Sequence, residues 1–240
     1  MNENLREHYS KLLGLEKPWE VTSVDLSMES QRVEIGVAHG GGVRVRCPGC
    51  GGVCGIHDEA PERRWRHLDT MQFETVIKAR IPRANCPGCG VKTIAVPWAG
   101  KHSRFTLLFE AFAIEVLKSS ASISSACRVL KLDWSAADRI MGRAVGRGLA
   151  RRGDGPVGKL GIDEKSFRSG HRYVSTLNDL AAGRVIEVVE GRDEASASKL
   201  FESLTAAQRD KVEAIALDMW RAFILIAAAM TSISESDGGW

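Results

Sequence analysis

Four cysteines in two closely spaced pairs are the residues of this sequence best suited to bind a metal ion. Cys47 with Cys50 and Cys86 with Cys89 each form a Cys-Pro-Gly-Cys unit followed by glycine, and 35 residues separate the two units. Two thiolates spaced in this way lie on one tight turn and face the same ion, and the Pro-Gly pair sets the turn. We therefore predict a structural zinc site, because four thiolates leave no open position for a substrate.

Other roles for the cysteines are less consistent with the pattern. A redox pair is the alternative for each unit, but the duplication of the unit favours zinc. Cys54 and His57 lie close to the first pair and offer spare ligands, yet a closed four-coordinate site needs no fifth. Cys127 falls in a helical segment, where we expect a buried apolar residue.

Two aspartates at the ends of expected strands form the second group that could do chemistry. The expected elements of this half of the chain are strands at 159–164, 171–179, 184–190 and 212–218, with a helix at 193–204 before the last strand. The first three strands make an antiparallel meander, and a crossover helix places the fourth strand parallel to the first. This order, which a ribonuclease-H-like fold uses, brings Asp163 close to Asp218.

Paired carboxylates of this kind hold Mg²⁺. Cutting or joining a phosphodiester requires an activated oxygen nucleophile and a stabilised leaving oxygen, which two hard cations about 3.5–4 Å apart supply together. Asp163 and Glu164 are neighbours in a strand and point to opposite faces, so only one lines the site, and we choose Asp163. Surface charge is the alternative for either aspartate alone, but the strand order favours a catalytic magnesium site at Asp163 and Asp218.

A basic helical region lies between the cysteines and the aspartates. Apolar residues recur every three or four positions over 104–118, which predicts an amphipathic helix with Ser103 as its N-cap. A short helix at 122–130, a turn, and a longer helix over 135–152 capped by Ser135 follow, and this is a helix-turn-helix layout.

The longer helix carries arginines at intervals of four, which we expect to form one drifting stripe with apolar residues on the inner face. Such a stripe would bind the phosphates of double-stranded DNA, whereas a solvated face without a partner is the alternative. The arginines are Arg139, Arg143, Arg147 and Arg151. A second basic cluster surrounds Trp65. Two interpretations of it are equally open: the cluster contacts backbone phosphates, or Trp65 is a structural residue of a small sheet.

Composition agrees with a folded protein of several domains. The 240 residues are 44% hydrophobic, with 33 Lys and Arg against 30 Asp and Glu, which excludes a disordered, collagenous or membrane protein. Residues 1–158 hold 23 basic and 17 acidic side chains, and the remainder holds 10 and 13. The start lacks a signal-peptide pattern, so we expect a cytoplasmic, nucleoid-associated protein without membrane contact.

The expected fold class is α+β multidomain, with a small β-rich zinc ribbon, a helix-turn-helix segment and an incomplete α/β ribonuclease-H-like domain. The expected boundaries are 1–40 for an N-terminal lead-in, 41–100 for the zinc-binding domain, 101–155 for the helix-turn-helix segment and 156–240 for the last domain.

In combination these motifs resemble a bacterial insertion-sequence transposase family with an N-terminal zinc-binding domain and a DDE catalytic domain. The likeness covers roughly residues 5–223 and includes the cysteine pairs, RWRHLD (64–69), GIDEKSFRSGHRY (161–173) and ALDMWRAF (216–223). It implies binding to the terminal inverted repeats of a mobile element, then Mg²⁺-dependent strand cleavage and transfer by three acids. Asp163 is similar to the first of these acids and Asp218 to the second.

The sequence departs from the family pattern after Phe223. The pattern continues with a strand, a long helical stretch and a glutamate far downstream, whereas Glu235 is a poor replacement for that glutamate. We therefore expect a truncated transposase with an incomplete active site.

Two other functions remain open. The first is a non-catalytic DNA-binding module that inhibits transposition, with a full-length transposase or a second copy of the chain as a possible partner. The second is a zinc-ribbon transcription regulator, which would leave the strands of Asp163 and Asp218 unexplained.

Overall fold

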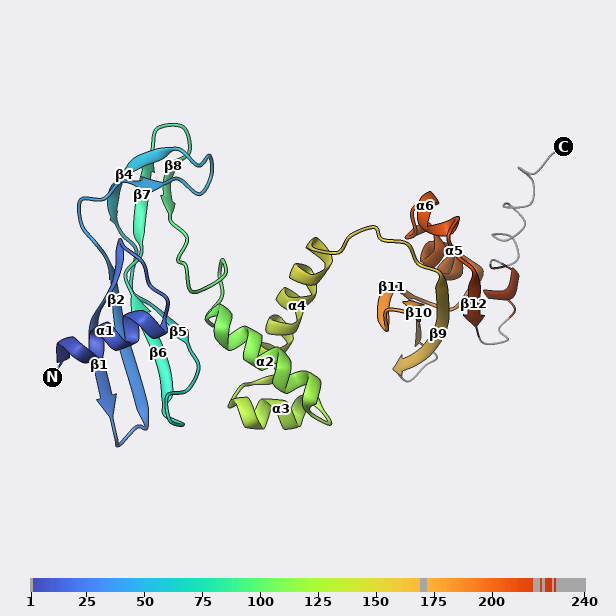
Figure 1. Cartoon of the computed structure of the whole chain (residues 1–240), viewed down its shortest axis with the longest axis horizontal. Helices are drawn as coiled ribbons and strands as arrows, with labels where there is room; N and C mark the ends of the chain where they lie inside the picture. Colours follow the sequence, from blue (N-terminus) through green and yellow to red (C-terminus); the bar gives the residue numbers. More distant parts are fainter. Residues whose placement is uncertain (1, 169–171, 218–220, 222, 226, 228–240) are drawn as a thin grey trace. The chain divides into compact units, whose positions relative to one another are not determined.

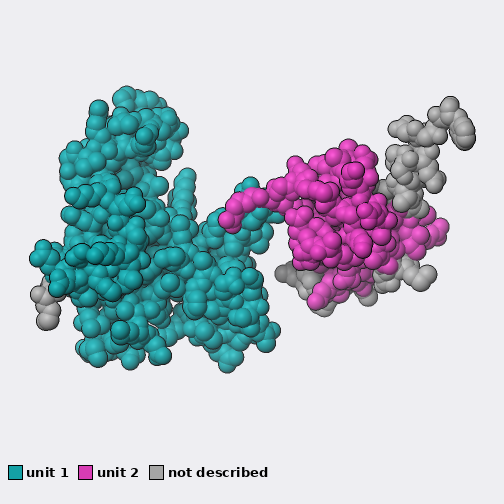
Figure 2. Space-filling view, in the orientation of Figure 1, with its two compact units in different colours: residues 1–150 teal, residues 151–240 magenta. Residues whose placement is uncertain are grey.

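The computed structural model describes residues 2–168, 172–217, 221, 223–225 and 227. The chain divides into two compact units, Met1–Ala150 and Arg151–Trp240 (Figures 1 and 2). The division lies close to the predicted boundary at residue 155, in the charged and glycine-rich link RRGDGP.

The described part of unit 1 holds two four-stranded sheets, an N-terminal helix and a group of three packed helices. In chain order the elements are α1 (Asn2–Leu12), β1 (Trp19–Ser27), β2 (Arg32–His39), β3 (Val45–Arg46), β4 (Val53–Glu59), β5 (Arg63–Arg66), β6 (Glu74–Ala79), β7 (Pro82–Cys86), β8 (Gly90–Thr93), α2 (Leu107–Ser119), α3 (Ile123–Leu130) and α4 (Trp134–Ala150).

The first sheet has the order β1-β2-β6-β5, with β2 and β6 parallel and the outer pairs antiparallel. Its core contains the fully buried side chains of Ile35, Trp65 and Ile77, and Trp98 packs edge-on against Trp65. Trp65 is therefore a structural tryptophan. Because β1 and β2 belong to this sheet, residues 1–40 are an integral part of the sheet and the predicted boundary at residue 40 does not separate two domains.

The second sheet carries the cysteine pairs and has the order β3-β4-β7-β8, antiparallel throughout. The chain visits the first sheet (β1, β2), the second (β3, β4), the first again (β5, β6) and the second again (β7, β8). The two sheets are thus built from interleaved segments of one chain, and Figure 1 shows them one above the other in unit 1.

Three helices pack around a small apolar core that includes Phe105, Phe109, Leu130 and Ile140. The helices confirm the predicted helix-turn-helix layout, although their N-caps differ from the predicted ones. Helix α2 begins after Thr106, whose hydroxyl accepts from the Phe109 amide at 3.2 Å.

Helix α4 begins one residue earlier than predicted, because Asp133 is its cap. Asp133 Oδ1 accepts from the Ala136 amide at 2.6 Å, and the hydroxyl of Ser135 also donates to it. The predicted cap Ser135 is therefore a residue of the first turn.

The described part of unit 2 contains a four-stranded sheet and the helices α5 and α6, and residues 221, 223–225 and 227 are also helical. The elements are β9 (Lys159–Arg168), β10 (Arg172–Asp179), β11 (Arg184–Glu190), α5 (Glu194–Glu202), α6 (Ala206–Arg209) and β12 (Ala214–Leu217). The order β11-β10-β9-β12 has an antiparallel meander followed by a β12 parallel to β9, which confirms the predicted topology.

One face of this sheet packs on α5. Leu160, Ile162 and Leu177 from the sheet meet Leu200 and Phe201 from the helix, and all five are buried. Asp193 caps α5 by accepting from the Ser196 amide at 2.8 Å. The amphipathic alternation of β9 and β10 thus fixes which face α5 covers. None of the helices in the described residues is both long and apolar enough to cross a bilayer.

Candidate metal centre and nucleic-acid interface

The four predicted zinc ligands come together at one end of the second sheet. Cys47 and Cys50 lie on the turn between β3 and β4, and Cys86 and Cys89 lie on the turn between β7 and β8. All four sulfurs lie within 4.8 Å of one another, with 3.6 Å between Cys50 Sγ and Cys86 Sγ. Four thiolates bound tetrahedrally at about 2.3 Å from zinc lie roughly 3.8 Å apart, so the geometry fits that ion.

Electrostatics at the cluster also favour a cation. The Gly49 amide donates to Cys47 Sγ at 3.4 Å, and this bond with one from the Cys50 amide lowers the pKa of Cys47 to about 7. The Cys89 thiol donates to its crowded neighbouring sulfurs, Cys50 first, and these hydrogen bonds raise the pKa of Cys89 to about 12. Four thiolates this close repel one another unless a divalent ion neutralises them, so the cluster is a structural Zn²⁺ site.

The nearby residues that we excluded as ligands make other contacts. Cys54 is buried and its thiol donates to the Val45 carbonyl at 3.6 Å, while burial raises its pKa. His57 Nδ1 lies 3.3 Å from Asp58 Oδ2. Neither belongs to the group of four sulfurs in the described residues.

The helix-turn-helix consists of α3 and α4, joined by a tight turn. Lys131 ends α3 with φ 53° and ψ 46°, the left-handed conformation that closes helices, and Asp133 then caps α4. The first two turns of α4 expose Ser135, Asp138 and Arg139, while Ile140 faces the core. In this motif the N-terminal part of the second helix is the part that contacts base edges.

The arginines of α4 do not form one exposed stripe, which corrects that expectation. Arg143 and Arg147 instead converge on Glu110 of α2, a carboxylate only 1% exposed. Arg143 Nε donates to Glu110 Oε1 and Arg147 Nη1 to Glu110 Oε2, each at 2.9 Å, and Ser103 Oγ donates to Oε1 at 2.8 Å. Two of the four predicted DNA-binding arginines therefore join α4 to α2.

Helix geometry explains the difference. A spacing of four advances about 40° per step, so the row from Arg139 to Arg151 drifts by about 120° around the helix. Arg143 and Arg147, in the middle of the row, therefore lie beside the inner face that Ile140 marks, where they pair with Glu110. Val145 and Leu149, two of the apolar residues expected on the inner face, are instead 59% and 58% exposed. Arg139 and Arg151 remain exposed.

The RWRHLD segment forms the joint between the first sheet and the helices. The Arg66 amide donates to the Arg104 carbonyl at 2.9 Å, and the Thr106 amide donates to the Arg66 carbonyl at 3.0 Å. His67 Nδ1 lies 2.9 Å from Thr106 Oγ1, the N-cap of α2. Burial, with Arg66 adding repulsion, lowers the pKa of His67 to about 4. The neighbouring arginines also bind protein groups, as Arg66 pairs with Asp69.

The predicted catalytic acids are only partly within the described residues. Asp163 lies on β9 and is exposed, and its Oδ1 accepts from the Glu164 amide at 2.9 Å. Glu164 is more buried and its Oε1 lies 3.6 Å from Arg192 Nη1. Asp218 and Glu235 lie outside the described residues. The described end of β12 is Leu217, which pairs in register with Ile162, the residue before Asp163.

Comparison with known proteins gives three matches in the order of these modules. Residues 44–89 match the zinc-finger of transposase IS204/IS1001/IS1096/IS1165, residues 94–145 match the helix-turn-helix domain of transposase family ISL3, and residues 160–233 match the ISL3 DDE model described as a transposase. The chain belongs to the ISL3 transposase family. The zinc cluster, the α3–α4 pair and the β9–β12 sheet are thus the three modules of an ISL3 transposase, and the family's helix-turn-helix and transposase domains suggest DNA binding.

Curated relatives of this chain are named as transposases of insertion sequence elements. Two strains of Mycobacterium tuberculosis, CDC 1551 / Oshkosh and ATCC 25618 / H37Rv, each have a transposase for insertion sequence element IS1557 that is 30% identical over 239 residues, covering 95% of this ISL3 chain and 53% of the relative. The transposase for insertion sequence element IS1001 of Bordetella parapertussis is 27% identical over 191 residues, covering 79% of this chain and 47% of the relative. The chain spans about half the length of the curated relatives it matches. No solved structure matches it significantly.

Proposed function

We propose that this chain binds the terminal inverted repeats of an insertion sequence and takes part in Mg²⁺-dependent cleavage and transfer of DNA strands. The observation that carries the proposal is the parallel pairing of β12 with β9 after the crossover through α5 and α6. In that register Leu217 pairs with Ile162, so the carboxyl end of β12 points to the part of β9 that holds Asp163. We therefore assign Asp163 and Asp218 as magnesium ligands.

Asp163 suits that role because of its position on the sheet. Ile162, one residue before it, is buried against α5, so the side chain of Asp163 belongs to the opposite face. The hydrogen bond from the Glu164 amide orients one oxygen of Asp163 and leaves the other available to a cation. Bound Mg²⁺ would activate the attacking oxygen and stabilise the leaving oxygen of a phosphodiester.

Recognition of DNA is assigned to α3 and α4. The exposed start of α4 would enter the major groove with Ser135, Asp138 and Arg139 toward the base edges. Arg139 of α4 and Arg151, the residue that follows the end of α4, are the proposed phosphate or base contacts, whereas Arg143 and Arg147 hold α4 in place through Glu110. Such a protein would work on the nucleoid in the cytoplasm, alone, as a homo-oligomer or with a full-length transposase.

The test measures binding and nicking separately. Labelled duplexes that carry the element's terminal repeats or shuffled sequence are titrated with the chain, and nicking is followed with and without Mg²⁺. We expect tighter binding to the repeats and a loss of that preference in Arg139→Gln. Nicking that requires Mg²⁺ and disappears in Asp163→Asn would assign catalysis to this chain, whereas its absence would agree with the incomplete active site expected from the sequence. Asp210→Asn, an exposed aspartate at the end of α6, is the matched control for charge removal.

The same experiment separates the alternative functions. Repeat-specific binding without nicking in wild type would favour a non-catalytic module that occupies the ends of the element and inhibits transposition. Specific binding only to sites outside the element would favour a zinc-ribbon transcription regulator. Equal affinity for repeats and shuffled duplex would contradict the assignment of α4 as the reader of sequence.

A further inference from the structure

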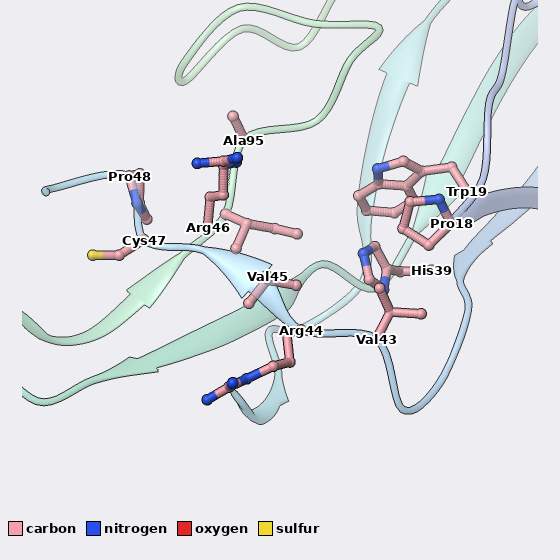
Figure 3. Close-up of a pocket in the computed structure, with 11 residues that line it drawn as sticks. Pro18, Trp19, His39, Val43, Arg44, Val45, Arg46, Cys47, Pro48 and Ala95 are labelled. Carbon is pink, nitrogen blue, oxygen red and sulfur yellow. The ribbon is translucent and has the colours of Figure 1, made fainter. Parts of the chain in front are cut away.

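Two hollows lie side by side in unit 1, where the second sheet, which carries the four cysteines, meets the first sheet. The first, the β3 hollow, has a volume of about 370 Å³, and Figure 3 shows Arg44 and Arg46 of its β3 side across from Trp19 and His39. The second, the β8 hollow, has a volume of about 490 Å³ and lies between the first cysteine turn, β8 and residues 94–102. The hollows share the lining residues Pro48, Ile94 and Ala95, so they form one continuous surface.

The charge of this surface has one sign. Arg44 and Arg46 line the β3 hollow, and Arg63, Lys92 and Lys101 line the β8 hollow. Among the described residues, no aspartate or glutamate lines either one. The two hollows therefore present a concave surface of positive potential, which attracts an anion more strongly than the same charges on a convex surface.

The contrast with the rest of unit 1 indicates that this charge is not needed for folding. Elsewhere on the two sheets, arginines and lysines bind carboxylates, as in the pairs Arg32–Glu74, Arg64–Glu34 and Lys78–Glu34. In the described part of the chain, the cations of the hollows that form no such pair with a carboxylate are Arg44, Arg46, Lys92 and Lys101. All four are exposed.

The shape and chemistry of the surface match a nucleic-acid backbone. Arginine presents a planar fork of donors that matches phosphate oxygens, and lysine adds a flexible point charge. Between the two groups of cations lies the apolar strip of Ile94 and Ala95, against which a sugar can pack. A row of cations on both sides of an apolar strip offers contacts to successive phosphates and no pattern of donors and acceptors that would read bases.

We propose that the β3 and β8 hollows bind the phosphodiester backbone of double-stranded DNA without sequence preference. They would provide a contact separate from α4, and the inference rests on the proposed function in taking DNA as the partner. Each phosphate neutralised by a cation releases counterions, which makes the slope of log K against log salt more negative by about 0.9 per contact.

The test uses double variants of the full chain and duplexes of repeat and shuffled sequence. Lys92→Gln with Lys101→Gln alters the β8 hollow at residues that are not zinc ligands, and Arg44→Gln with Arg46→Gln alters the β3 hollow. We expect each double variant to make the slope of log K against log salt less negative by roughly 1–2. Binding to both duplexes should weaken by the same factor, about tenfold or more. Zinc content and melting temperature are measured for each variant, to show that the fold is retained.

The matched control is Lys11→Gln with Arg80→Gln, which removes two exposed charges that line neither hollow. Unchanged salt slopes in both hollow variants, with repeat-specific binding intact, would overturn the inference and leave the proposed function standing. An equal fall in the control would also overturn it, because net charge alone would then explain the effect. Salt-dependent binding that needs the hollows, but shows no preference for the repeats, would support the inference and contradict the proposed function.

Discussion

Replacing Glu110 by glutamine should destabilise unit 1 strongly, although the change keeps the size of the side chain. The carboxylate accepts hydrogen bonds from Ser103, Arg143 and Arg147 and is 1% exposed. Glutamine keeps one acceptor oxygen, yet it loses the negative charge that balances two guanidinium groups. Their charge would then remain beside a buried neutral amide, which is the unfavourable result of removing one partner of a buried ion pair.

The magnitude follows from the exposure of the partners. Removing one member of a fully buried pair costs about 3–5 kcal/mol. The Arg143 and Arg147 side chains are 28% and 41% exposed, so water stabilises them in part. We therefore expect a loss of about 2–3 kcal/mol in the free energy of unfolding, which lowers the melting temperature of a unit of this size by roughly 5–10 °C.

Thermal unfolding of the wild type, Glu110→Gln and Glu115→Gln provides the assay. Glu115 lies on the same helix but pairs with Lys118 at the surface, where its side chain is 69% exposed, so its variant should melt within about 1 °C of the wild type. A double-mutant cycle of Glu110→Gln with Arg143→Gln should give a coupling of at least about 1 kcal/mol. Equal melting temperatures for both glutamate variants, or a coupling near zero, would refute the structural role of these arginines.

Three further predictions concern pH, metal and backbone. The pKa of His67 is lowered to about 4, so the folded protein holds this side chain neutral while the unfolded chain takes up a proton near pH 6.5. The free energy of unfolding is therefore highest above pH 6.5 and falls as the pH is lowered from 6.5 to 4. Chemical denaturation should show a loss of about 3 kcal/mol over that range, and the loss should be absent in His67→Gln. Removal of zinc by a chelator, or Cys86→Ser, should unfold the second sheet, and circular dichroism that stays unchanged after metal loss would argue against a structural ion. Gly191 has φ 103° and its missing Cβ would meet Ser196 Oγ, so Gly191→Ala should cost about 1–3 kcal/mol, whereas Gly55→Ala, with nothing near it, should cost less than about 1 kcal/mol.

Unit 2 could be predicted from the sequence because local signals leave one arrangement. Three alternating strands with short turns must form a meander, and a helical connection to the next strand, which the structure divides into α5 and α6, allows one right-handed crossover. The predicted segment 184–190 coincides with β11, and the turn at Gly183 has the positive φ that a glycine there supplies. The cysteine spacing was equally sufficient for the zinc cluster, since both turns are defined within four residues.

Two sets of distant partners in unit 1 could not be predicted. The parallel pairing of β2 with β6 joins Ile35 to Ile77, and no local pattern near either residue indicates the other. The arginines of α4 were misplaced because Glu110, their partner, lies 33 residues before Arg143. One signal was nevertheless available, because Glu110 is a single carboxylate within the apolar run TLLFEAFAI and needs a buried cation there.

The interleaving of the two sheets determines when each can form during synthesis. When the ribosome has released the chain only as far as β4, it has supplied one hairpin of each sheet and two of the four thiolates, Cys47 and Cys50. The core of the first sheet cannot form until β6 pairs with β2, and that of the second sheet cannot form until β7 pairs with β4. Complete coordination of zinc therefore has to wait for β6 and β7, and tight retention of the metal by a nascent chain would report that both sheets have formed.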